Sequence, residues 1–286
     1  MLLGVSACDK SGGGGSNASP DEVTVPGYED ASSADMAAIP FALDDGDLAG
    51  VHARGMTIWR MQRAMRLGDR AFAGFVGVTA AKFVSIASVD PGGSSGQVAY
   101  YRWDEEDLAD GQASASEARN WVIASVTLDP DEALDPQELD GKPDGEQRRT
   151  IAALLVAQGA AAAEYPEARW VAYTFREQVV AGGEPTGLRQ TRVYMIGADD
   201  QSPDIEYTVH DPSKRKQPVE IVKSELQLAG DATSKLPLTT SAQSVGPSTV
   251  ARAVAIATVT KKPVKIVDAA GGEWEVAPKT GELTKL

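Results

Sequence analysis

The sequence predicts an α+β fold in which helices pack on antiparallel meander sheets. Two observations support this class: three stretches carry apolar residues at helical spacing, and each is followed by strand-like runs. Runs of strands after a helix favour antiparallel sheets with helices on one face. A hydrophobic content of 42% over 286 residues is enough for a real core, in one large or two modest domains.

The first helix is predicted to begin after a cap-forming run of acids that ends at Asp47, and to stop at Gly68. Its apolar residues recur at spacings of three, four and seven. Three strands are expected next, at residues 82–89, 97–103 and 120–128. The first two should form a hairpin, because Pro and Gly supply the turn dihedrals between them.

The second helix has the clearest boundaries. Asp144 can cap it and Gln147 lies three residues later, as in a capping box. Tyr165 should end it, because the residue before a proline avoids helical dihedrals. Four strands are expected after it, near residues 168–180, 188–197, 204–210 and 218–228.

The strand at 204–210 alternates between apolar and polar residues. Ile205, Tyr207 and Val209 should face the core. The other side chains should face water, as is typical of an antiparallel sheet with one wet face. These are Asp204, Glu206, Thr208 and His210.

Residues 231–248 are rich in Ser, Thr and Pro and are typical of a linker. A third helix, marked by Val250, Val254 and Ala257, should precede a hairpin of residues 264–267 and 274–276. The stretch 274–283, with its Thr-Gly turn, is similar in shape to the end of PepSY-type domains. The order of elements in 144–228 is similar to cystatin-like and nuclear-transport-factor-2-like cones, but a fold analogy does not give a function.

Cys8, the only cysteine, follows Val5-Ser6-Ala7 and precedes a Ser/Gly-rich stretch. These four residues resemble the lipobox of bacterial lipoproteins. The resemblance implies cleavage before Cys8 and its lipidation, which places the protein on the periplasmic face of the cell envelope. Asp9 resembles an inner-membrane retention signal. Only seven residues precede Cys8 and none is basic, so either the true start lies upstream of Met1 or the signal is incomplete.

The expected organisation follows from these signals. Residues 1–7 are a truncated signal peptide, and 8–43 are the lipidated cysteine and a disordered tether. Residues 44–230 form the globular body, with possible sub-units 44–130 and 144–230. The linker 231–248 leads to a small C-terminal unit, 249–286, of one helix and a hairpin.

A net charge of −14 and a pI near 4.6 argue against nucleic acid as a partner, since phosphate binding needs a basic surface. The acids cluster, and residues 21–47 hold eight acids and no base. The cluster at 129–146 does not fit an EF-hand loop, because the third ligand and the glycine at position six are missing. Neither a metal nor any other cofactor is predicted.

Two groups of residues are candidate contact sites. Arg63, Arg66 and Arg70 lie on one face of the first helix and could contact lipid headgroups or an acidic partner, or pair with the chain's own acids. A second group of aromatic residues could line an apolar ligand site in a half-open sheet, although most are expected in the core. These are Trp170, Tyr173, Phe175 and Tyr194.

Catalytic motifs are weak. Ser94 lies in a G-x-S-x-G match with His210 downstream, but a strand and not a helix follows, so a hairpin turn explains it better than a nucleophile elbow. Two histidines, His52 and His210, are too few for a typical zinc site. We therefore expect a non-enzymatic envelope lipoprotein with a binding or scaffolding role, anchored in the bilayer through Cys8. A small-apolar-ligand binder is the alternative, and a serine hydrolase is a distant third.

Overall fold

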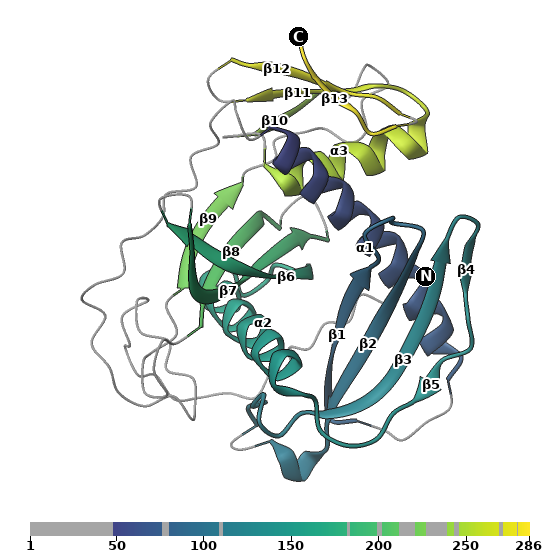
Figure 1. The fold of residues 1–286 in the computed structure, drawn as a ribbon, viewed down its shortest axis with the longest axis vertical. Coiled ribbons are helices and arrows are strands. Elements are labelled where there is room, and N and C mark those ends of the chain that lie inside the picture. The colour runs from purple at the N-terminus through teal and green to yellow at the C-terminus, as the bar shows by residue number, and fades with distance from the viewer. Residues whose placement is uncertain are drawn as a thin grey trace.

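The computed structural model describes residues 48–75, 80–108, 111–181, 184–198, 202–211, 221–226, 239–242, 246–268, 271–278 and 280–286. Within them, three helices alternate with three sheets along the chain, which confirms the predicted α+β class (Figure 1). The predicted signal peptide 1–7, the tether 8–43 and Cys8 lie outside the described residues.

The first unit is one long helix followed by an antiparallel meander. The order β1-β2-β3-β4 follows the chain, and β5 pairs with β3 beyond β4. The hairpin predicted at 82–89 and 97–103 is confirmed, with Lys82 opposite Trp103 and Val89 opposite Gly96. Its elements are α1 (Leu48–Ala73), β1 (Lys82–Val89), β2 (Ser95–Trp103), a short 3-10 turn (Glu105–Asp107), β3 (Arg119–Leu128), β4 (Asp131–Ala133) and β5 (Gln137–Glu138).

The predicted stop at Gly68 is wrong, because α1 continues to Ala73. Gly68 marks a close approach and not a terminus. A Cβ built there would lie 2.8 Å from Val98 Cγ2 on β2 and 3.2 Å from the Tyr100 hydroxyl. Gly55, nearer the start of the same helix, has a similar role, since a Cβ there would lie 2.6 Å from Val250. Both glycines let α1 lie against its neighbours without a side chain between them.

The second unit repeats the same plan. The predicted capping box is present: the Gln147 amide N–H donates to Asp144 Oδ1, and the Asp144 N–H donates to Gln147 Oε1, each at 2.8 Å. The helix ends before Tyr165, as predicted. The four expected strands are present in the order β6-β7-β8-β9. The elements are α2 (Gly145–Glu164), β6 (Trp170–Ala181), β7 (Glu184–Gly197), β8 (Asp204–His210) and β9 (Ile221–Leu226).

The third unit is built from α3 (Pro247–Thr260) and a four-stranded sheet. The expected linker 231–248 differs from the structure, because residues 239–242 form a strand, β10, that pairs in parallel with β11. The predicted hairpin is present as β11 and β12, and the Thr-Gly turn connects β12 to β13. The strands are β10 (Thr239–Ala242), β11 (Val264–Asp268), β12 (Glu273–Val276) and β13 (Leu283–Lys285).

The helix α1 belongs to more than one core. Its C-terminal half packs on the first sheet, and its N-terminal half packs on α3, as Figure 1 shows. Ile58 and Met65 lie in the cluster that covers the first sheet, whereas Val51 packs with Val254 and Trp274 of the third unit. A separate cluster joins α2 to the facing sides of the first and second sheets. The three units therefore share their cores.

The wet face predicted for β8 is wrong. Asp204, Glu206 and His210 are only 1%, 3% and 7% exposed. The alternation itself is correct, because Ile205, Tyr207 and Val209 pack with α2. The polar side is buried because Arg252 of α3 pairs with Asp204, and Arg192 of the neighbouring strand β7 pairs with Glu206. Burial of this face depends on partners from another strand and from a helix, so the strand pattern alone could not predict it.

Candidate functional site

The arginines of α1 have different partners. Arg54 donates to Glu177 on β6 at 2.8 Å and to the Tyr194 hydroxyl at 3.2 Å. The Arg60 guanidinium lies against Gly93, in the turn between β1 and β2. Arg63 bonds the Leu128 carbonyl and Asp131 at the turn from β3 to β4, and stacks on Trp59 with 4.9 Å between its Cζ and the ring centroid. These three side chains hold α1 to the two following sheets.

In the predicted contact patch, Arg63 makes contacts within the protein, whereas Arg66 and Arg70 are exposed. Neither exposed guanidinium has a hydrogen-bond or ion-pair partner among the residues that the structure describes. The structure therefore splits the patch into one residue that holds the fold and two that are available to other molecules. Exposed acids also lie near this end of α1, among them Asp69 next to Arg70 and Asp135 on the facing loop.

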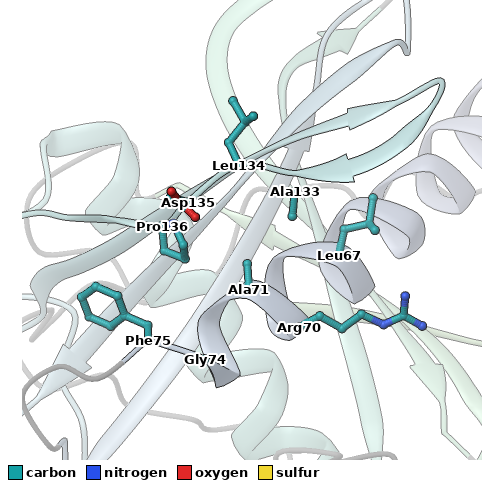
Figure 2. A pocket seen from close by; sticks show the side chains of 9 residues that line it. All are labelled: Leu67, Arg70, Ala71, Gly74, Phe75, Ala133, Leu134, Asp135 and Pro136. Carbon is teal, nitrogen blue, oxygen red and sulfur yellow. The ribbon is translucent and has the colours of Figure 1, made fainter.

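A groove lies between the last turns of α1 and the loop from β4 to β5, with Arg70 in its lining and Arg66 about one helical turn earlier on α1. Its volume is about 700 Å³, and it is open to solvent. Figure 2 shows Leu67 and Ala71 of the helix on one side and Ala133 to Pro136 on the other, with Arg70 extending away from Asp135. Its lining residues are Leu67, Arg70, Ala71, Gly74, Phe75, Ala133, Leu134, Asp135 and Pro136.

Both walls of this groove are held in place by defined contacts. The Leu134 N–H donates to the Ser125 carbonyl at 2.9 Å, and the Leu139 N–H donates to the Trp121 carbonyl at 2.7 Å. The helix wall is fixed by Phe72, which stacks on Tyr100 with 4.2 Å between ring centroids. Despite this support, 52% of Leu134 is exposed. A preformed groove with an exposed leucine at its rim costs little ordering when another molecule binds.

Sequence reasoning missed the groove. Leu134 stands alone among acids in the stretch Asp131-Glu132-Ala133-Leu134-Asp135, and a single apolar residue in a polar loop is normal. Its significance comes from its position opposite Leu67 and Phe75, which the fold alone determines. The only sequence signal was the basic spacing of Arg66 and Arg70.

The polar face of β6, β7 and β8 is a second concentration of functional groups. Arg192 lies at its centre, where it donates to Glu177 on β6 and to Glu206 on β8, the latter at 2.9 Å. Burial raises the pKa of Glu206 above its ordinary value. Burial also opposes the charge of Glu177, but Arg192 and Arg54 outweigh it and lower the pKa of that carboxyl.

Next to this network, Asp204 of β8 pairs with α3. Its carboxylate accepts from Arg252 Nη2 at 2.6 Å and from the Gly197 N–H at 2.8 Å. Its side chain is completely buried, and burial raises the pKa of Asp204 even with Arg252 beside it. Perturbed pKa values accompany both functional sites and structural ion pairs. Every charge on this face described above has an opposite charge in contact, so the face ties α1 and α3 to the second sheet.

The predicted aromatic group is divided between the two faces of the second sheet. Tyr173, Phe175 and Tyr194 share the face that α1 covers, and Phe175 meets Tyr194 edge-on at 5.5 Å. Trp170 lies on the other face, where its indole N–H donates to the Pro203 carbonyl at 2.7 Å. Tyr194 is fully buried and Tyr173 is 4% exposed, so these rings are part of the packed core.

The residues weighed for catalysis lie apart. Ser94 lies in the turn between β1 and β2, where its hydroxyl is 3.4 Å from Asp90 Oδ2. His210 is buried at the end of β8, in a different sheet. The other histidine, His52 on α1, lies 2.7 Å from the Gly281 carbonyl in the turn before β13. In the described part of the chain, no group of three acids, histidines or cysteines is arranged to hold a metal ion.

Comparison of the chain with protein-family models, with curated proteins and with solved structures gave no match. None of the described helices combines the length and the apolar character needed to cross a bilayer. The groove beside Arg66 and Arg70 is thus the candidate functional site by its own geometry: a preformed, partly apolar surface with exposed positive charge at its edge.

Proposed function

We propose that this chain is a bacterial envelope lipoprotein whose α+β body binds a partner protein and catalyses no reaction. The observation that carries the proposal is the groove between α1 and the β4–β5 loop, with the exposed Arg70 in its lining and the exposed Arg66 about one helical turn earlier. The lipobox-like residues before Cys8 support a location at the cell envelope. The lipid anchor would keep the body at the membrane surface, where its partners would be envelope proteins.

The chemistry of the groove favours an extended acidic segment that also carries apolar side chains. Leu67, Phe75 and Leu134 offer apolar contact, and the two exposed arginines offer charge. Complementary charge gives specificity and speeds encounter more than it adds affinity.

The alternative is a body that encloses a small apolar ligand. It is favoured less, because Tyr173, Phe175 and Tyr194 fill the core with their own contacts. A hydrolase that uses Ser94 is favoured least, because that serine lies in a turn beside Asp90 and not beside His210.

The anchor is tested by the intact mass of the protein extracted from membranes of its native host. The expected mass begins at Cys8 and includes acyl chains, and the Cys8→Ser chain should lose both. An unprocessed chain in the soluble fraction would refute the proposed location at the cell envelope. It would also refute the inference that the partners are envelope proteins.

The groove is tested in the same cells with a photo-crosslinking phenylalanine derivative in place of Leu134, which is half exposed. A crosslink to an envelope protein should disappear in the Arg66→Glu/Arg70→Glu chain. It should persist in an Arg148→Glu/Arg169→Glu control, which reverses two other exposed arginines. Equal crosslinking in both double variants would reject the groove as the contact surface.

A further inference from the structure

We infer that the partner in this groove is a second copy of the chain, with the β4–β5 loop of each copy seated in the groove of the other. The inference rests on the proposed function and deepens it, because it names the partner of the same surface. Three observations on the described residues carry it: the composition of the loop, the arrangement of charge across the groove and the exposure of Leu134.

The β4–β5 loop has the composition that the groove favours. Residues 131–136 are Asp-Glu-Ala-Leu-Asp-Pro, an acidic stretch with one large apolar side chain. Pairing with β3 holds the stretch in place, and Leu134 nevertheless remains 52% exposed. Every copy of the chain therefore presents, already ordered, an acidic segment of the kind inferred above for the groove. A preformed segment costs little conformational entropy on binding.

Charges of opposite sign lie on the two walls of the groove. The helix wall carries Arg70, with the exposed Arg66 about one helical turn earlier. The loop wall carries Asp135, with the exposed Glu132 three residues before it. These four side chains form no ion pair within the described residues, and Figure 2 shows Arg70 extending away from Asp135. Both walls therefore offer unpaired charge to another molecule.

Two other acids near this end of α1 already have partners. Asp69, beside Arg70, accepts from the Tyr100 hydroxyl on β2 at 2.8 Å. Asp131, at the start of the loop, pairs with Arg63. The helix wall is thus left with two arginines for an incoming acidic loop, and the loop wall is left with two acids for incoming arginines.

A second copy fits this arrangement of charge. A contact across a twofold axis joins the same patch of both copies, so the patch must be complementary to itself. A wall with arginines beside a wall with acids has this property, whereas a partner of one sign cannot use both walls. When each loop enters the opposite groove, Arg70 of one copy meets Asp135 of the other, and the pair forms twice. Leu134 at the same time reaches Leu67 and Phe75 of the second copy and leaves water.

Direct pairing of the two sheet edges is a different dimer, and the edge disfavours it. Among the described strands, β4 and β5 end the first sheet, so their outer sides could add a strand from another chain. Pro136 interrupts this edge, and Asp131, Glu132 and Glu138 are exposed along it. Two such edges side by side would place acids near acids, which destabilises strand pairing. The seating of each loop in the opposite groove places its acids beside arginines instead.

The first test is sedimentation equilibrium of the purified full-length Cys8→Ser chain. Interfaces of ordinary size bind with Kd values from micromolar to picomolar, so the chain should be a dimer at about 100 μM. Leu134→Asp should make it monomeric at that concentration. Val259→Asp, at a side chain that is 80% exposed on α3, is the matched control and should leave the dimer intact. Thermal unfolding checks that both variants fold.

A charge swap tests how the loop is seated. Arg70→Glu and Asp135→Arg, each alone, should raise the Kd of the dimer by at least about tenfold, because like charges then meet twice across the axis. The double variant Arg70→Glu/Asp135→Arg should recover most of that loss, because opposite charges meet again. The Arg148→Glu/Arg169→Glu control should leave the Kd unchanged. A double variant that recovers nothing would overturn the proposed contact.

Crosslinking identifies the residues in contact. An equal mixture of isotope-labelled and unlabelled chains, both with the photo-crosslinking residue at position 134, should give products that join a labelled to an unlabelled copy. Their second site should lie among the groove-lining residues between 67 and 75. Position 134 also lines its own groove, so only the mixed-label products report on the dimer. A crosslinking residue at Ala163, exposed on α2, should give no mixed-label product.

Other results would overturn the inference. A monomer at about 100 μM, or a dimer that Leu134→Asp leaves intact, would mean that the groove does not receive a second copy. Absence of mixed-label products would mean the same. In cells, the crosslink from position 134 should be a covalent dimer of the chain. A crosslink there to a different envelope protein, with a monomeric purified chain, would refute the second copy and leave the proposed function in place.

Discussion

Replacing Arg252 with Met should destabilise the protein strongly, because it leaves a buried charge without its partner. Asp204 has a completely buried side chain, and Arg252 supplies its only ion pair in the described structure. Removing one partner of a buried pair costs about 3–5 kcal/mol. We expect about 3 kcal/mol, at the low end of that range, because a quarter of Arg252 is exposed and the Gly197 N–H still donates to Asp204.

The loss of stability in Arg252→Met should depend on pH, and the direction of that dependence follows from the pKa of Asp204. Burial already raises the pKa of Asp204, and Arg252 opposes that rise, so its loss raises the pKa further. A carboxyl whose pKa is higher in the folded state than its unfolded value of about 4 takes up a proton on folding at intermediate pH. The folded variant can then neutralise Asp204 as the pH falls. Its deficit in stability should therefore be largest near pH 8 and should shrink toward pH 5.

Urea unfolding at pH 8 and pH 5 measures both quantities, with the slope checked for two-state behaviour. The matched control is the double variant Arg252→Met/Asp204→Asn, which removes the stranded charge and should recover part of the loss at pH 8. A loss below about 1 kcal/mol, the value of an exposed pair, would refute the reasoning. So would a deficit that is the same at both pH values.

Four further substitutions test the packing and capping of α1 and α2. Gly68→Ala should cost about 1–2 kcal/mol by thermal unfolding, because overpacking against Val98 exceeds the gain in helix propensity of about 1 kcal/mol. Gly159→Ala on α2, where a Cβ meets nothing within 4 Å, should instead stabilise the chain, and equal effects at both sites would contradict this account. Asp144→Ala should cost about 1 kcal/mol in urea unfolding through loss of the capping box, and an unchanged midpoint would mean that the cap is unimportant. Phe72→Ala should cost about 3–5 kcal/mol and weaken the near-ultraviolet circular dichroism signal; a preserved signal would show that the ring is not packed as described.

Local signals predicted the elements well. The Asp144 capping box and the proline after Tyr165 bounded α2 correctly, because both act within one helical turn. The turn after Val89 likewise bounded the first hairpin. Such signals depend on residues that are neighbours in the sequence, so the sequence alone displays them.

Features that depend on distant contacts were predicted less well. Gly68 resembles a helix stop, but its role is set by Val98 on β2. The polar face of β8 resembles a wet surface, but Arg192 and Arg252 bury it with charge compensation. The groove was invisible for the same reason, since it exists only where the β4–β5 loop comes beside the end of α1.

The shared packing of α1 has a mechanical consequence. The chain before Leu48 continues covalently into the first turn of this helix, so a pull on α1 from that end acts along the helix. The helix packs on α3, on the first sheet and, through Arg54, on the second sheet. A pull along its axis must therefore shear contacts with three units together and cannot peel them away one at a time. The membrane anchor proposed above would apply its load to this helix, and three units would share that load.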